Sequence, residues 1–228
     1  MKLRVSTLAI VVLSFSSIGL RGETLTIPRG TAVTIDGREE PGEWDDAMSA
    51  DLRGGQYIRL KTDGQYLYLS IKGEKLGISS VAIHTDDEVK ILHASAGLIT
   101  AVYKREGGHW NQTEEFRSEG QAPLRQEKST TARIAKKLEL YRWCANILPR
   151  KVPADFDVQN ITEYKISLEL LKNDVSTMSV VFSQRTAKMP LARAPFDLDD
   201  DSLKKSMVHG SNVPILNFEP DTWLTLKW

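Results

Sequence analysis

The chain has 228 residues, and its 30 lysines and arginines balance 30 aspartates and glutamates to a formal net charge of zero. This balance excludes proteins that bind nucleic acid through a general excess of positive charge. A hydrophobic fraction of 41%, with 15 glycines and 9 prolines, excludes a disordered or fibrous chain. The single cysteine excludes an internal disulfide and a thiolate metal cluster, so a packed core must supply the stability.

The N-terminal residues 1–22 have the pattern of a secretory signal peptide. Lys2 and Arg4 give a basic start, and residues 5–20 then run without a charge around an apolar stretch. This run is shorter than the roughly 20 apolar residues that a membrane-spanning helix needs. A permanent N-terminal anchor is the alternative. We expect residues 23–228 to form one secreted or periplasmic domain, mildly acidic and without a stable membrane span once the signal peptide is cleaved.

From Glu23 onward, apolar and polar residues alternate, which is typical of half-buried strands. The alternation predicts strands over residues 57–61, 66–72, 78–85, 89–94, 98–103, 164–170, 178–182 and 222–227. Two of the connections are predicted to be tight hairpin turns, at Asp63–Gly64 and at Gly107–Gly108, because both central positions of a primed turn need positive φ. The second hairpin is expected to end near Phe116.

Two segments break the alternation. Ile134, Leu138 and Tyr141 recur at helical spacing and predict one amphipathic helix over residues 129–142. Residues 184–217 contain three prolines and an acidic run, and they predict a long irregular loop. Many short strands with regular turns favour an all-β fold, an antiparallel β-sandwich of jelly-roll type with one inserted helix.

Residues 33–48 read Val-Thr-Ile-Asp-Gly-Arg-Glu-Glu-Pro-Gly-Glu-Trp-Asp-Asp-Ala-Met and precede the alternating run of residues 66–73. This stretch resembles the opening of the family 9 carbohydrate-binding-module-like domains, which are related to the DOMON β-sandwiches. Within it, Trp44 and Ala47 lie three residues apart and are expected to plug one end of the sandwich as core residues. The resemblance implies an exported, non-catalytic domain that binds carbohydrate, often beside a glycoside hydrolase.

Saccharide binding needs an aromatic face for the ring and fixed polar groups for the hydroxyls. Trp110 follows a glycine turn, where a large apolar residue has little reason to lie unless it binds a ligand, and Trp143 follows the expected helix. We expect these two tryptophans to stack on a saccharide, with His109, Asn111 and Arg142 as hydrogen-bond partners. The alternative is that both indoles pack against the protein, whereas Trp223 and Trp228 are expected to be structural.

Three other interpretations remain open on the sequence alone. The carboxylates at Asp86–Glu88 and Asp199–Asp201 could hold structural calcium, although neither run has the spacing of a known calcium loop. A DOMON-like redox module could hold haem between Met178 and either His84 or His93, although a histidine in an alternating strand is more often hydrogen-bonded. A cell-envelope interaction domain is the third. No enzyme motif with a diagnostic spacing occurs.

Overall fold

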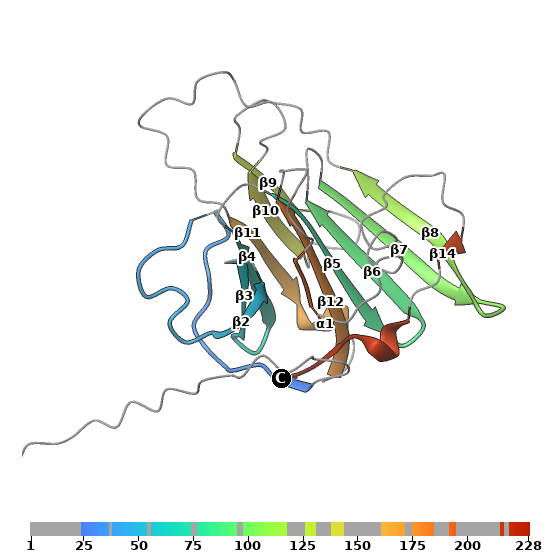
Figure 1. The fold of residues 1–228 in the computed structure, drawn as a ribbon, viewed down its shortest axis with the longest axis horizontal. Coiled ribbons are helices and arrows are strands. Elements are labelled where there is room, and N and C mark those ends of the chain that lie inside the picture. Colours follow the sequence, from blue (N-terminus) through green and yellow to red (C-terminus); the bar gives the residue numbers. More distant parts are fainter. Residues whose placement is uncertain are drawn as a thin grey trace, which may run out of the picture.

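The computed structural model shows two β-sheets packed face to face (Figure 1), which confirms the all-β sandwich. It describes residues 24–36, 38–53, 56–73, 77–94, 98–117, 126–130, 138–143, 161–171, 175–184, 192–194, 215–216 and 219–228. The expected signal peptide, Cys144 and Asp199–Asp201 lie outside these ranges. No helix within them is both long and apolar enough to cross a membrane.

The larger sheet, sheet A, has the strand order β1-β15-β12-β5-β6-β7-β8-β14, and β13 also pairs with β12. Its strands are β1 (Thr24–Thr26), β5 (Gly77–Thr85), β6 (Glu88–Ala94), β7 (Leu98–Glu106), β8 (His109–Arg117), β12 (Val175–Gln184), β13 (Ala192–Ala194), β14 (Ile215–Leu216) and β15 (Leu224–Lys227). All neighbours are antiparallel except β1 and β15.

The smaller sheet, sheet B, is antiparallel throughout, with the order β2-β3-β4-β11-β10-β9. Its strands are β2 (Met48–Arg53), β3 (Gln56–Thr62), β4 (Tyr66–Lys72), β9 (Gln126–Thr130), β10 (Leu138–Trp143) and β11 (Ile161–Ser167). Short helical turns complete the described fold: α1 (Leu168–Leu171) follows β11, and the 3₁₀ turn η1 (Pro220–Thr222) precedes β15.

The core lies between the two inner faces and follows the alternation of the strands. Val81 and Ile83 of sheet A share one buried apolar cluster with Leu69, Tyr164 and other residues of sheet B. A hydrogen bond crosses this core between the hydroxyl groups of Ser79 and Tyr164 at 2.7 Å. Residues of opposite parity on each strand therefore face outward.

The N-terminal cover, residues 29–36 and 38–47, lies against the outer face of sheet B. Trp44, Val33 and Ile35 are buried there against Tyr68 of β4, with Ala47 packed beside them. Trp44 is therefore a packing residue, as expected, but it packs on the outer face of sheet B and not at an end of the sandwich. In Figure 1 this segment forms the blue loops beside β2, β3 and β4.

The two predicted hairpins are present, but their turns differ. Gly107 and Gly108 both have positive φ, at 58° and 86°, as a tight primed turn requires. In the other hairpin Gly64 has positive φ, and Asp63 stabilises the turn through its side chain. The Asp63 carboxylate accepts the backbone N–H groups of Gln65 and Tyr66, each at 2.7 Å.

The amphipathic helix expected over residues 129–142 is wrong. Residues 126–130 and 138–143 are the strands β9 and β10, which extend sheet B beyond β11. Leu138 and Leu140 also fit an alternating pattern, and pairing with the available edge of β11 overrides the helical spacing. The structure also differs from two other expected element boundaries. The strand expected to Leu170 ends at Ser167, where α1 begins, and the expected loop 184–217 includes β13 and β14.

Candidate functional site

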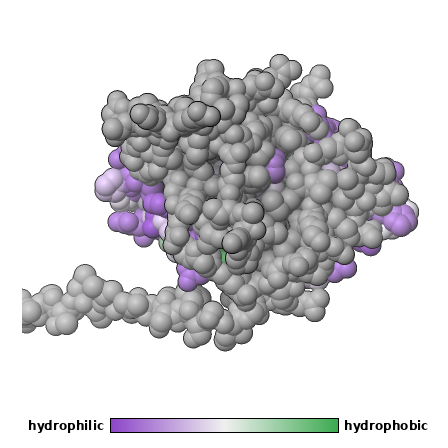
Figure 2. Space-filling model, turned by 45° about the horizontal axis from the view of Figure 1, so that its top comes forward, coloured by the Kyte–Doolittle hydropathy of each residue, from purple (hydrophilic) through white to green (hydrophobic). Residues whose placement is uncertain are grey.

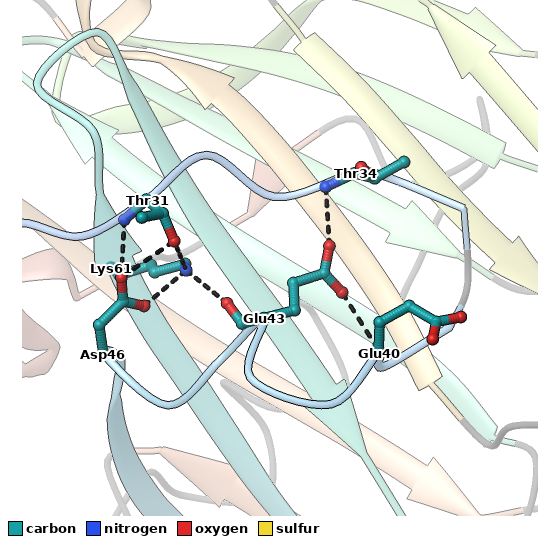
Figure 3. Close-up of polar contacts among 6 residues, drawn as sticks. All are labelled: Thr31, Thr34, Glu40, Glu43, Asp46 and Lys61. Carbon is teal, nitrogen blue, oxygen red and sulfur yellow. Dashed lines mark hydrogen bonds and ion pairs between the residues drawn. The ribbon is translucent and has the colours of Figure 1, made fainter.

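A buried lysine holds the N-terminal cover against sheet B. Lys61 points outward from β3, yet its side chain is fully buried under the cover. Its ammonium donates to Asp46 Oδ1 at 2.6 Å, to the backbone carbonyl of Glu43 at 2.5 Å and to Thr31 Oγ1 at 3.2 Å (Figure 3). An ammonium has three N–H donors, so this group is saturated. We call Lys61, Thr31, Glu43 and Asp46 the Lys61 cluster.

The carboxylates of the cover also bind its own backbone. Asp46 Oδ2 accepts the N–H of Thr31 at 2.7 Å and its hydroxyl at 3.0 Å, while Glu43 accepts the N–H of Thr34 at 2.9 Å (Figure 3). The hydrogen bond from Lys61, followed by that from the Thr31 backbone, lowers the pKa of Asp46 to about 2. Because these donors and acceptors bind one another, the Lys61 cluster is a structural clamp.

A second polar group lies on the outer face of sheet A, at the end formed by the β5–β6 turn and the β7–β8 hairpin. The His84 ring on β5 meets the Trp110 ring on β8 edge-on, with centroids 5.8 Å apart. The guanidinium of Arg105, opposite Trp110 in the strand register, lies 6.0 Å from the indole centroid. Thr177 Oγ1 on β12 lies 3.3 Å from His84 Nδ1. These four residues form the His84 cluster.

The environment of His84 keeps its imidazole neutral near pH 7. Burial lowers its pKa, and the hydrogen bond to the Asp86 backbone and the charges of Asp221 and Asp86 oppose this only in part. A neutral imidazole offers one donor and one acceptor. Asp86 adopts a left-handed conformation, with φ of 52°, where the chain turns from β5 into β6. The His84 cluster thus combines a neutral imidazole, a guanidinium, a hydroxyl and an indole.

Much of the described surface around this group is polar. Arg105, Asp86 and Asp221 are exposed, and His84 itself is half-buried. Figure 2 shows hydrophilic residues at the right-hand end of the molecule, where the tip of the β7–β8 hairpin lies in Figure 1. The groups that can meet a ligand here are therefore hydrogen-bonding side chains around a buried indole.

The structure separates the residues expected to bind a saccharide. Trp110 is only 3% exposed, so the expectation of an exposed indole at the hairpin tip is wrong. Its ring lies against His84 and Arg105, because burying a large indole is more favourable than leaving it in water. His109 is exposed and Asn111 half-buried, and alternation along β8 directs both to the face opposite Trp110.

The other two expected ligand residues belong to a different sheet. Arg142 and Trp143 are in β10 of sheet B, where their backbones pair with Glu127 and Gln126. Trp110 is in sheet A, so the two tryptophans come from separate layers of the sandwich. The side chains of Arg142 and Trp143 lie outside the description. Trp223 is buried and Trp228 packs against the core, in line with their expected structural role.

The haem arrangement expected as an alternative does not form. Met178 on β12 points into the core between the sheets and is fully buried there. His84 pairs across the strands with Thr177, the neighbour of Met178, and faces the opposite side of sheet A. His93 also faces outward and hydrogen-bonds Ser80 Oγ at 2.8 Å. A methionine and a histidine on opposite faces of one sheet cannot ligate a single iron.

The described residues contain no group of three or more side chains arranged to hold a metal ion. In the acidic turn Asp86–Glu88, the Glu88 carboxylate already binds Lys90 at 2.7 Å and Lys104 at 3.2 Å. This carboxylate therefore has two cationic partners within the protein.

No protein-family model, curated protein or solved structure matches the chain. Sequence reasoning found Trp110 but missed Arg105, which lies directly opposite it in the hairpin. The signal was available, because a two-residue turn at Gly107–Gly108 pairs residues 105 and 110. The contribution of Thr177 had no such signal, since β12 lies far away in the sequence.

Proposed function

We propose that this chain is an exported, non-catalytic domain that binds a saccharide at the His84 cluster. The observation that carries the proposal is the exposed guanidinium of Arg105, held above the Trp110 indole beside the neutral imidazole of His84. A guanidinium donates to sugar hydroxyls, and a neutral imidazole can both donate to and accept from them.

The mode of binding differs from the one expected from the sequence. Because Trp110 is buried, hydrogen bonds from groups around the indole take the place of stacking on an open aromatic face. The exposed carboxylates of Asp86 and Asp221 supply acceptors close to His84. A glycoside hydrolase that acts on the same saccharide is the partner that such a domain would serve. Export rests on the sequence of residues 1–22, and N-terminal sequencing of exported protein tests it.

Glycan-array screening of the exported chain, followed by calorimetry on the best saccharide, tests the binding proposal. Arg105→Ala should weaken binding by about 10- to 100-fold, the typical loss for a hydrogen bond to a charged group. His109→Ala is the matched control, because it changes an exposed basic residue of the same hairpin on the opposite face. It should leave the affinity unchanged.

Two results would contradict the proposal. A loss of binding in His109→Ala with full retention in Arg105→Ala would move the site to the other face of β8. Failure of the folded chain to bind any saccharide would remove the carbohydrate function and favour an interaction domain of the cell envelope. Circular dichroism of each variant shows whether a loss of binding reflects a loss of fold.

A further inference from the structure

Besides the Lys61 cluster, another polar group lies on the outer face of sheet B, in reach of solvent beside the N-terminal cover. The Glu39 carboxylate is bound through Oε1 by Arg59 and through Oε2 by Lys72. The Tyr57 hydroxyl lies 3.4 Å from Glu39 Oε2. Three side chains of the sheet thus converge on one carboxylate supplied by the cover.

The strand register explains why these donors are neighbours. Tyr57 and Arg59 lie two residues apart on β3 and share a face, and Lys72 on β4 is directly opposite Tyr57. Ser70 on β4 lies directly opposite Arg59 on the same face. Its hydroxyl is fully buried and has no hydrogen-bond partner among the described residues. The sheet therefore presents three donors to this position, those of Tyr57, Arg59 and Lys72, and Glu39 engages all three.

The site is only partly closed by its internal carboxylate. The side chain of Glu39 is 10% exposed, whereas those of Arg59 and Lys72 remain 29% and 31% exposed. A solute can therefore approach both cations beside Glu39. Burial alone would lower the pKa of Lys72, but its hydrogen bond to Glu39 and the Glu39 charge outweigh burial and raise this pKa. Lys72 is therefore charged at neutral pH.

We propose that Tyr57, Arg59 and Lys72 form a binding site for the carboxylate group of a ligand, and that Glu39 is the internal carboxylate which this ligand displaces. A guanidinium and an ammonium held side by side are a common means of recognising carboxylates. The site does not depend on the proposed saccharide site, because it lies on the other sheet and uses other residues.

How tightly Glu39 binds Arg59 and Lys72 sets how much its removal should raise the affinity for an added carboxylate. Partly exposed ion pairs contribute little to stability, and two of them should reduce the affinity for an added carboxylate by roughly 2- to 30-fold. Glu39→Gln removes the competing charge and keeps the length of the side chain. Glu40→Gln is the matched control, because it makes the same change one residue later at an exposed position.

The test is a nuclear magnetic resonance titration of the isotopically labelled full chain at constant ionic strength. Acetate carries the carboxylate alone, glucose carries a sugar ring without it, and glucuronate carries both. Acetate and glucuronate should shift the amide resonances of Arg59 and Lys72 in Glu39→Gln at 2- to 30-fold lower concentration than in the native chain or Glu40→Gln. Glucose should leave these resonances unchanged.

Equal titration midpoints in Glu39→Gln and the native chain would overturn the proposal, as would shifts that spare Arg59 and Lys72. Should Glu39→Gln fail to fold, Lys72→Met in the otherwise native chain decides the question. It should abolish the response of the Arg59 amide to high acetate, and a persistent response would overturn the site. Saccharide binding at the His84 cluster should be unaffected by any of these substitutions.

Discussion

From the burial of the Lys61 cluster we predict that substituting Asp46 lowers the free energy of unfolding more than substituting its ion-pair partner Lys61. The Lys61 side chain is fully buried, whereas that of Asp46 is 35% exposed. Asp46→Asn removes the counter-charge of the buried ammonium and brings an amide N–H group against a neighbouring donor, and the two effects together cost about 3–5 kcal/mol. The new amide directs its NH₂ group toward a donor, either the Lys61 ammonium or the Thr31 N–H, because the two carboxylate oxygens accept from both.

Lys61→Met should lower the free energy of unfolding by less than Asp46→Asn. The Asp46 carboxylate that remains is reached by water, so its charge is not stranded in the interior. The Glu43 carbonyl loses its donor at 2.5 Å, and an unsatisfied carbonyl costs about 1–3 kcal/mol. The methionine side chain places an apolar group near the Trp44 ring, whose centroid lies 5.6 Å from the Lys61 ammonium. The difference between the two variants is therefore expected to be about 2 kcal/mol in the free energy of unfolding.

Urea unfolding at pH 7, followed by far-ultraviolet circular dichroism, measures both values. Asp45→Asn is the control, because it makes the same change at an exposed neighbour and should alter the free energy of unfolding by less than about 0.5 kcal/mol. If Lys61→Met proves as destabilising as Asp46→Asn, or more so, the reasoning that the burial of the ammonium sets the cost is refuted.

Three further predictions concern the clamp and the core. The pKa of Asp46 is lowered from 3.8 to about 2, so its contribution to the free energy of unfolding is complete above pH 4 and is lost as the pH falls toward 2. Solvent screening of this partly exposed group reduces that contribution to about 1 kcal/mol. Acid titration of the unfolding free energy should show the loss in the native chain and not in Asp46→Asn. Gly30→Ala should destabilise by about 1–3 kcal/mol in urea unfolding, since the added Cβ would lie 2.6 Å from Asp46 Oδ2 and displace that carboxylate. Tyr164→Phe should cost about 1–2 kcal/mol by leaving the Ser79 hydroxyl without its partner across the core, and a double-mutant cycle with Ser79→Ala should show that the two losses are not additive.

The strands and hairpins could be predicted because their signals are local. Alternation along β3 to β7 follows from which side chains face the core, and the glycines at residues 107 and 108 fix a turn that needs positive φ. The strand β10 could not be distinguished from a helix by spacing alone. Its identity depends on pairing with β11, whose nearest residue is 18 positions beyond the end of β10.

Within the candidate site, only the residues that belong to one hairpin could be predicted as neighbours from the sequence. Arg105 and Trp110 are paired by the Gly107–Gly108 turn, and alternation alone places His109 on the face away from Trp110. The contact between Trp110 and His84 crosses β6 and β7, so it depends on the order of four strands in the sheet. The same holds for Glu39, which reaches Lys72 from a loop 33 residues earlier in the chain.

The fold pairs several charges of the described residues locally. The Lys61 ammonium is matched by Asp46, the Glu88 carboxylate by Lys90 and Lys104, and two cations of sheet B by Glu39. The balance therefore excludes a general attraction for polyanions and still permits a cationic site of two side chains. Glu39 of the N-terminal cover competes for that site, so removing this one charge in Glu39→Gln should raise the affinity of Arg59 and Lys72 for an added carboxylate.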